Sequence, residues 1–450
     1  MTSQSFRQYA QQNVPRYTSY PTAPHFSEDV DAATYEEWLS RLDPHAPVSL
    51  YLHVPFCRQI CWYCGCNMKL ASRPEPVGDY AATLMREVSL LAERLPDRMT
   101  ISHLHWGGGT PTVLEPDDFE CAMNVVYAHF DIAEDAELAV ECDPRTLRRE
   151  MIERIGRLGF TRASFGVQEF DPRVQAAINR IQPPDMVQGA VTALRGAGVE
   201  GINFDLIYGL PHQTTETLLD TIALCARMRP DRIALFGYAH VPWMAKKQRM
   251  IDETALPRSA QRIEQATEAA KALKAAGYVA IGLDHFALPE DSMAKALDDG
   301  TLRRNFQGYT TDTAQALLGV GSTSIGRTPD GFVQNISETG AWAREVEAGR
   351  LPIGKGRAFR GQDRLRGEVI EALMCRGNVD LHALADVHGA PQKWYAQSAG
   401  ALADLVREGI IIFEDGRIAL TEVGMPLVRI VASAFDEYLS QNPMRHAAAV

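Results

Sequence analysis

Cys57-Arg-Gln-Ile-Cys61-Trp-Tyr-Cys64-Gly-Cys66 holds four of the chain's eight cysteines within ten positions, directly after a short apolar run. We expect this stretch to form a loop that follows a strand. Its first three thiols, at spacings of four and three residues, can converge on one metal centre. The other four cysteines are scattered singly through amphipathic segments, which is typical of reduced cytosolic proteins and disfavours a disulfide framework.

Thiolate ligands select soft metals, so zinc and an iron-sulfur cluster are the two candidates. A structural zinc site closes four ligands, often as two separated Cys-x2-Cys pairs, and the sequence holds no second pair. CxxxCxxC supplies three ligands to a [4Fe-4S] cluster and leaves one iron open. We therefore predict a cluster with Cys57, Cys61 and Cys64 as metal ligands, and chemistry at the open iron.

Composition limits the partners of the protein. The net charge of -12 disfavours a nucleic-acid-binding surface, although it does not exclude an acidic substrate bound by a local cluster of Arg and Lys. No apolar run approaches the roughly 18 residues that a membrane helix needs. The first residues lack an apolar core followed by a cleavage site, so we expect no secretory signal and a cytoplasmic location.

From Val48 onward, short apolar runs alternate with amphipathic segments. The expected strands are Leu50–Val54, Ile101–Trp106, Leu138–Cys142, Arg162–Val167, Ile202–Tyr208, Ile233–Tyr238 and Val279–Leu283. The expected helices between them are Tyr80–Leu95, Phe119–His129, Met151–Leu158, Pro184–Ala197, Glu216–Met228 and Ala260–Ala276. Repeated strand-helix units predict an α/β fold with a parallel sheet, closed partway into an incomplete (β/α)6 barrel. Sites in such folds gather at the carboxyl ends of strands, where the cysteine loop begins.

The pattern predicts three domains. Residues 1–45 form an arm that we expect to be ordered and to cover the active site, with a disordered arm as the alternative. Residues 46–358 form the catalytic barrel and its extension. Residues 359–450 are helical stretches, a hairpin with an Asp415-Gly416 turn and a last helix over Pro426–Leu439, which predict a small winged-helix-like domain. No run of Arg and Lys stands out on its expected recognition helix, which disfavours DNA binding.

CxxxCxxC resembles the signature of the radical S-adenosylmethionine (SAM) enzymes. The resemblance implies that SAM chelates the open iron, and that reduction of the cluster cleaves SAM to a 5'-deoxyadenosyl radical. With Cys66 added, and preceded by Tyr51-Leu-His-Val-Pro-Phe56, the stretch is similar to one branch, the oxygen-independent coproporphyrinogen III oxidases (dehydrogenases) of haem biosynthesis. The arm motif Pro15-Arg-Tyr-Thr-Ser-Tyr-Pro-Thr22 also resembles that branch.

Further site residues follow the expected strands. Three glycines in His105-Trp-Gly-Gly-Gly-Thr110 let another group approach backbone ligands, with a plain tight turn as the alternative. This motif resembles the one that holds the methionine amino group of SAM. The branch holds a second SAM beside the first, and its motif positions imply two sets of cofactor-binding residues. The first set is Tyr51, Gly108, Glu141 and Ile325; the second is Tyr63, Gly109, Thr110, Gln168, Arg180, Asp205 and Ala239.

Cys66 is separated from Cys64 by one residue, which makes ligation of the same cluster awkward. A small buried residue is the alternative role. The related haem-chaperone branch resembles CxxxCxxC with an aromatic residue at this position, so Cys66 favours the oxidase. We predict Cys66 and Tyr51 as catalytic residues, with Cys66 acting on the substrate radical or its hydrogen transfers.

The resemblance covers essentially the full length and implies anaerobic oxidative decarboxylation of coproporphyrinogen III to protoporphyrinogen IX, in which the propionates of rings A and B become vinyl groups. It implies an electron donor such as flavodoxin or ferredoxin and an electron acceptor that the sequence does not identify; we expect a monomer. Arg16, Arg303 and Arg304 are candidates for holding propionates, with surface ion pairing as the alternative. A haem chaperone without decarboxylation and a non-enzymatic zinc protein remain as alternative hypotheses.

Overall fold

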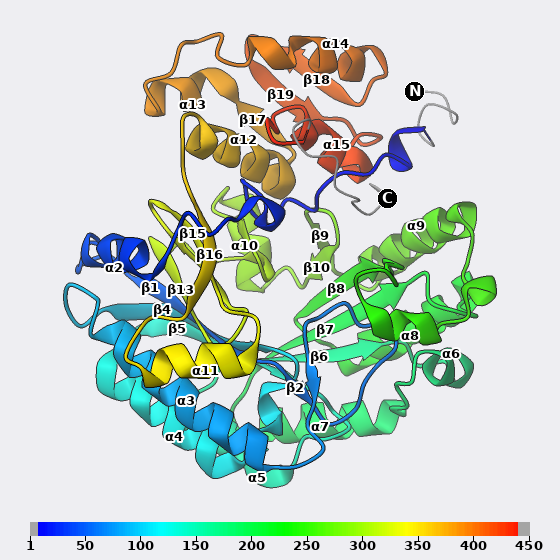
Figure 1. Cartoon of the computed structure of the whole chain (residues 1–450). Helices are drawn as coiled ribbons and strands as arrows, with labels where there is room; N and C mark the ends of the chain where they lie inside the picture. The colour runs from blue at the N-terminus through cyan, green and yellow to red at the C-terminus, as the bar shows by residue number, and fades with distance from the viewer. Residues whose placement is uncertain (1–7, 440–450) are drawn as a thin grey trace. The chain divides into compact units, whose positions relative to one another are not determined.

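The computed structural model describes residues 8–439, which fall into two compact units whose elements Figure 1 labels. The larger unit comprises Ser27–Tyr278 and Ala314–Ala358. The smaller unit comprises the described parts of Met1–Phe26, Val279–Thr313 and Phe359–Val450. Residues 1–7, on which the expectation of no secretory signal partly rests, and the C-terminal residues 440–450 lie outside the described residues.

The strands of the larger unit form one continuous sheet in the order β16-β15-β14-β13-β1-β4-β5-β6-β7-β8. Six strands that are each followed by a helix run parallel to one another: β1 (Val48–Val54), β4 (Thr100–Gly108), β5 (Asp131–Cys142), β6 (Arg162–Gln168), β7 (Gly201–Tyr208) and β8 (Arg232–Gly237). The helices that follow them are α3 (Glu75–Ala92), α4 (Pro116–His129), α5 (Arg149–Arg157), α7 (Pro184–Gly196), α8 (Thr215–Met228) and α9 (Ser259–Ala275). The predicted α/β fold with six strand-helix units is confirmed.

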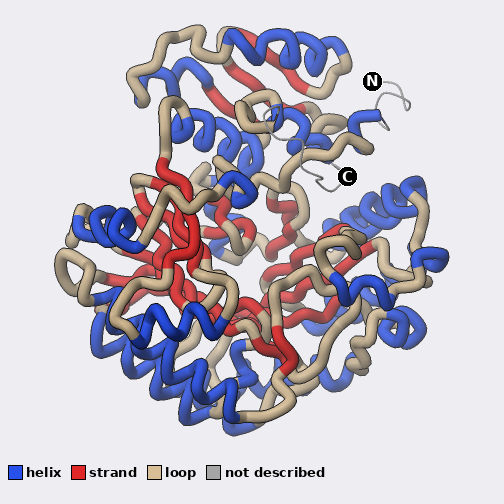
Figure 2. Tube along the Cα trace, viewed as in Figure 1, coloured by secondary structure: helices blue, strands red, loops and turns tan. Residues whose placement is uncertain are grey.

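The helices of consecutive strand-helix repeats in the larger unit pack side by side and form one layer on the sheet (Figure 2). Strand β6 is buried along most of its length. Helices α4 and α7 begin with a proline in the first turn, where its missing N–H costs nothing. Helix α8 begins at a capping box between Thr214 and Thr217. This part also contains four shorter elements: α2 (Ala32–Ser40), α6 (Pro172–Ala177), and β2 (Phe56–Cys57), which pairs with β3 (Lys69–Leu70).

The sheet extends beyond the six units on the β1 side. β13 (Ala316–Val320) pairs parallel with β1, and β14 (Ile325–Thr328), β15 (Gly331–Asn335) and β16 (Ile353–Ala358) continue antiparallel, with α11 (Thr339–Glu347) between the last two. The buried carboxylate of Glu87 in α3 ties this extension to the barrel. It accepts hydrogen bonds from Gly321 N at 2.7 Å, Asn335 Nδ2 at 2.5 Å and Trp342 Nε1 at 2.9 Å.

The smaller unit contains the predicted C-terminal domain. Its helices are α10 (Ser292–Asp298), α12 (Asp363–Arg376), α13 (Leu381–Val387), α14 (Ala399–Arg407) and α15 (Val428–Ser433). Its strands are β9 (Val279–Ile281) with β10 (His285–Ala287), β11 (Arg303–Asn305) with β12 (Gly308–Thr310), and the sheet β17 (Asn378–Asp380), β19 (Arg417–Leu420) and β18 (Ile411–Glu414). Asp415 and Gly416 form the predicted hairpin turn, with φ of 47° and 75°.

The strand expected from Leu138 begins at Asp131, and the helix expected over Tyr80–Leu95 covers Glu75–Ala92. Two further expected elements end earlier for a local physical reason. The run expected to be a strand at Val279–Leu283 ends at Ile281, because Gly282 adopts a φ of 56° and the chain returns as the antiparallel β10. The last helix ends at Ser433 instead of continuing to Leu439. Beyond it the carbonyls of Ala434 and Phe435 accept hydrogen bonds from Ser398 Oγ and Arg366 Nη1, which a continued helix would have used internally.

Residues 8–26 of the arm are ordered within the smaller unit, whereas residues 27–45 belong to the larger unit. Tyr17 donates its hydroxyl to Asp436 at 3.0 Å, the Tyr20 hydroxyl accepts from Glu437 N at 3.1 Å, and Arg429 Nε donates to Pro15 O at 2.9 Å. That the arm covers the active site stays a prediction, as does the division at 1–45, 46–358 and 359–450.

Among residues 8–439 the structure contains no helix that is both long and apolar enough to cross a membrane.

Glu87 should make the stability of the protein depend on pH. Burial raises its pKa from 4.5 to about 7, against the opposing effect of its hydrogen bonds. The folded state therefore binds the proton more tightly, so this contribution is complete below about pH 4.5 and is lost as pH rises through 7. We expect a loss on the order of 3 kcal/mol in the free energy of unfolding across that window, measured by urea unfolding of the apoprotein.

Glu87→Gln should remove this pH dependence, because the amide mimics the protonated acid. Glu93→Gln, at the exposed end of the same helix, is the matched control and should keep it. Equal pH profiles for wild type and Glu87→Gln would contradict the assignment.

Candidate functional site

Most of the predicted site residues lie at the carboxyl ends of the parallel strands in the larger unit. β1 leads into the cysteine loop, β4 ends in the glycine run, and β5 ends beside Glu141. Gln168 is the last residue of β6, and Asp205 lies in the second half of β7. Because the strands are parallel, these ends meet at one edge of the sheet, as the sequence predicted.

The cysteine loop is closed at its base and fixed along its length. Phe56 and Cys57 pair with Lys69 and Leu70 in the short β2–β3 ladder. Further along, Trp62 N donates to Ile178 O at 2.9 Å, and Asn179 Nδ2 donates to Ile60 O at 2.7 Å. The loop is therefore held against the segment that follows β6.

Each of the three predicted ligand sulfurs accepts a hydrogen bond. Thr110 Oγ1 donates to Cys57 Sγ at 3.4 Å, Cys66 N donates to Cys64 Sγ at 3.4 Å, and two guanidinium groups donate to Cys61 Sγ. Burial raises the pKa of Cys57 to about 11, against the opposing effect of the hydrogen bond from Thr110.

This donor set fits a [4Fe-4S] cluster, whose thiolate sulfurs are ordinarily surrounded by N–H and O–H donors. Within residues 8–439, no group of three or more His, Cys, Asp or Glu side chains is already arranged to hold a metal ion. The fit therefore rests on the chemistry of Cys57, Cys61 and Cys64 and of the groups that donate to them.

The glycine run contacts the start of the cysteine loop so closely that no side chain fits. A Cβ on Gly109 would lie 2.6 Å from Phe56 O and 2.8 Å from Phe56 N. Gly109 N donates to Val54 O, and Thr110 N donates to Phe56 O, both at 2.8 Å. Gly108 adopts a φ of 112°, and a Cβ there would meet the His53 ring at 2.6 Å. The run therefore does more than form a tight turn.

Glu141 joins the first set of predicted SAM residues. Its Oε2 accepts from Gly108 N at 3.1 Å, and its Oε1 lies 3.2 Å from His105 Nε2. The Tyr51 ring stacks on His105 with centroids 5.8 Å apart, and its hydroxyl lies 2.9 Å from His53 Nδ1. Burial lowers the pKa of His53 to about 4, so that ring is neutral near pH 7.

Gly319 is the residue that brings Ile325 close to Tyr51. Gly319 pairs with Tyr51 across β13 and β1, and a Cβ on Gly319 would lie 2.9 Å from Ile325 O. The four residues of the first predicted set are therefore brought together.

Gln168 and Asp205 present groups suited to a ligand. Gln168 adopts a φ of 67° after a bulge in the β6–β7 pairing, and its buried Oε1 has no hydrogen-bond partner among the described residues. Burial, followed by the charge of Glu141, raises the pKa of Asp205 to about 7. An unpaired buried amide oxygen is costly unless a ligand fills the position.

Tyr63 and Ala239 are linked by Gln248. Its Nε2 donates to Tyr63 O at 2.8 Å and to Ala239 O at 3.1 Å. The Tyr63 side chain packs against the apolar cluster that contains Ile207 and Tyr238. The other members of the second predicted set lie around the same strand ends: Gly109, Thr110, Gln168, Arg180 and Asp205.

Cys66 is exposed, unlike the buried Cys61, and its carbonyl accepts from Lys247 Nζ at 2.9 Å. The alternative role of Cys66 as a small buried residue is therefore wrong. The candidates for propionates, Arg16, Arg303 and Arg304, belong to the smaller unit. There Arg303 forms an ion pair with Glu371 at 3.6 Å.

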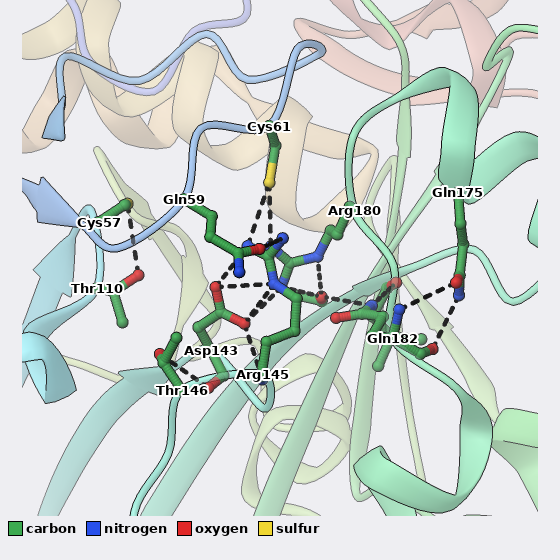
Figure 3. Close-up of polar contacts among 12 residues, drawn as sticks. Cys57, Gln59, Cys61, Thr110, Asp143, Arg145, Thr146, Gln175, Arg180 and Gln182 are labelled. Carbon is green, nitrogen blue, oxygen red and sulfur yellow. Dashed lines mark hydrogen bonds and ion pairs between the residues drawn. The ribbon is translucent and has the colours of Figure 1, made fainter. Parts of the chain in front are cut away.

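Sequence reasoning missed the two residues that hold others in place here, Gln248 and Arg145. Arg145 forms a buried ion pair with Asp143, whose Oδ2 lies 2.6 Å from Arg145 Nη2 (Figure 3). Although burial opposes it, this pairing and the charge of Arg180 hold the pKa of Asp143 below its ordinary value. The signal for Arg145 was its place just after β5, in Asp143-Pro-Arg145; nothing marked Gln248.

Comparison with known proteins shows the family of the chain. The radical SAM superfamily matches residues 51–225, and the HemN C-terminal domain matches residues 360–427. The chain is 49% identical over 442 residues to an oxygen-independent coproporphyrinogen III oxidase from Bradyrhizobium diazoefficiens, covering 98% of each. The chain belongs to the oxygen-independent coproporphyrinogen III oxidase family of radical SAM enzymes.

Other members of this family are also similar over nearly the whole chain. A Salmonella typhimurium oxidase is 37% identical over 429 residues, covering 95% of this chain and 93% of its own. The solved structure of coproporphyrinogen III oxidase (HemN) from Escherichia coli, described as a radical SAM enzyme, matches with a TM-score of 0.91 and 34% identity, covering 95% of this chain and all of the other. The predicted family and the assignment as an enzyme that uses SAM are confirmed.

The contact between the glycine run and Phe56 gives a test of the site. Gly109→Ala should push the cysteine loop away from β4, because its Cβ meets backbone rather than a flexible side chain. We expect loss of bound iron after anaerobic reconstitution and about 1–3 kcal/mol lower stability.

Gly65→Ala is the matched control, since it lies in the same loop with nothing within 4 Å of its Cβ. Iron content and the thermal midpoint should then stay at wild-type values. Full iron content in Gly109→Ala would show that the close contact does not position the loop.

Proposed function

We propose that this enzyme converts coproporphyrinogen III anaerobically to protoporphyrinogen IX by oxidative decarboxylation of two propionates. The observation that carries the proposal is full-length similarity to oxidases of that substrate, combined with Cys66 directly after the three predicted ligands. When bound, a [4Fe-4S] cluster supplies the electron that cleaves SAM to a 5'-deoxyadenosyl radical.

Each propionate that is converted loses one hydrogen atom, one carbon dioxide and one electron. The radical chemistry that bound SAM would supply removes one hydrogen atom from the β-carbon, and that hydrogen would end on 5'-deoxyadenosine. The substrate radical then loses carbon dioxide and one electron, which leaves the vinyl group. The electron goes to an acceptor outside this chain, and the first electron comes from a donor such as flavodoxin or ferredoxin. We further propose that the enzyme works as a cytoplasmic monomer.

The residues of the chain have distinct proposed roles. Cys57, Cys61 and Cys64 hold the cluster. Glu141 and the Gly108 backbone, which already share a hydrogen bond, orient the first SAM beside Tyr51. Cys66, exposed beside Cys64, acts on the substrate radical or its hydrogen transfers. The second set holds a second SAM, for which the unpaired Gln168 Oε1 is a ready acceptor.

The direct test is anaerobic incubation with coproporphyrinogen III, SAM and a reductant, followed by chromatography of the porphyrins and of 5'-deoxyadenosine. We expect vinyl product that forms together with 5'-deoxyadenosine. Stable haem binding with no turnover would favour the haem-chaperone alternative.

The cysteines separate ligation from catalysis. Serine in place of Cys57, Cys61 or Cys64 should abolish the cluster, because the hard hydroxyl is a poor ligand for iron in such a site. Cys66→Ser should keep the cluster and stop turnover. The iron content measures whether the cluster is retained, and the yield of vinyl product measures turnover. If Cys66→Ser loses iron, Cys66 is a ligand and its proposed role fails.

The proposed second SAM site sets the number of SAM molecules that each enzyme should bind. Equilibrium dialysis of the reconstituted enzyme with labelled SAM should give two molecules per cluster. Asp205→Asn should weaken the second by about tenfold or more and spare the first, since it replaces a carboxyl oxygen by an amide nitrogen that cannot accept a hydrogen bond. A stoichiometry of one in the wild type would contradict the second site.

A further inference from the structure

Two guanidinium groups donate to the sulfur of Cys61. Arg145 Nη2 lies 3.4 Å from Cys61 Sγ, and Arg180 Nη1 lies 3.3 Å from it (Figure 3). Both arginine side chains are buried, with exposed fractions of 4% and 7%. Two buried cations therefore face one predicted cluster ligand.

Neither arginine is free to turn away. Asp143 Oδ1 accepts from Arg145 Nε at 2.9 Å, and its Oδ2 accepts from Arg145 Nη2 at 2.6 Å. Arg145 Nη1 also donates to Gln59 Oε1 at 3.0 Å. Arg180 is fixed separately, since its Nε and Nη2 donate to Gly166 O at 2.9 and 2.6 Å. The geometry at Cys61 is therefore set before any ligand binds.

The charges do not cancel in this group. Asp143 pairs with Arg145 and lies 3.6 Å from Arg180, so one carboxylate serves two guanidinium groups. The remaining positive charge lies beside Cys61, in a buried region where charges interact strongly. A guanidinium group stays protonated in proteins, so both arginines keep their charge.

Hydrogen bonds and positive charge at a ligand sulfur favour the reduced, more negative state of an iron-sulfur cluster. We propose that Arg145, together with Arg180, raises the reduction potential of the cluster through the Cys61 sulfur. Arg145 is thus a positioning residue that eases the electron transfer on which SAM cleavage depends. The inference rests on the proposed function, because it requires a cluster at the three cysteines.

The test is a redox titration of the anaerobically reconstituted enzyme without SAM, followed by electron paramagnetic resonance. Arg145→Gln should be about tenfold harder to reduce, which for one electron is about 59 mV toward more negative potential. Arg145→Lys, which keeps the charge but has a single nitrogen, should shift in the same direction by less.

Arg148→Gln is the matched control. Arg148 lies three positions further along, is half-exposed and pairs with Glu115 at 2.8 Å, so its loss should leave the midpoint unchanged. An unchanged midpoint in Arg145→Gln at full iron content would overturn the proposal.

If Arg145→Gln does not retain iron, the midpoint potential and iron content of Arg145→Lys test the proposal instead. A more negative midpoint supports the proposal, whereas a wild-type midpoint or loss of iron overturns it, because the arginine would then only hold the loop. A wild-type enzyme without any cluster is a different outcome, since it refutes the proposed function itself.

Discussion

The site depends on the close contact between the glycine run after β4 and the first residues of the cysteine loop. Gly109 and Thr110 donate to backbone carbonyls on both sides of Pro55, and a Cβ at Gly109 would overlap Phe56. This contact fixes where the loop leaves the barrel. The three predicted ligand sulfurs, Glu141 on the next strand and the guanidinium groups on Cys61 all take their positions relative to it.

Much of the barrel could be predicted because its signals are local. Six strands and the helices between them have the right residue types at the right periods, and the Asp415-Gly416 turn has a known backbone preference. The cysteine spacing similarly marks the site in a single loop. These features depend on short stretches of sequence, so tertiary contacts did not have to be known.

The missed features depend on residues that are distant in the chain. The sheet extension from β13 to β16 is held to the barrel by the buried Glu87, which in sequence looks like any helix glutamate. Arg145 and Gln248 likewise act through contacts with loops some 84 and 185 positions away. The last helix was overestimated because two carbonyls beyond it bond to other elements.

The proposed function requires that Cys57, Cys61 and Cys64 hold a cluster with one iron open to SAM. The most direct measurement is the electron paramagnetic resonance spectrum of the reduced enzyme before and after SAM is added. We expect a cluster signal that changes shape when SAM is added, because SAM would become a ligand of the open iron. A colourless zinc protein without a signal, or a cluster signal that SAM leaves unaltered, would contradict it.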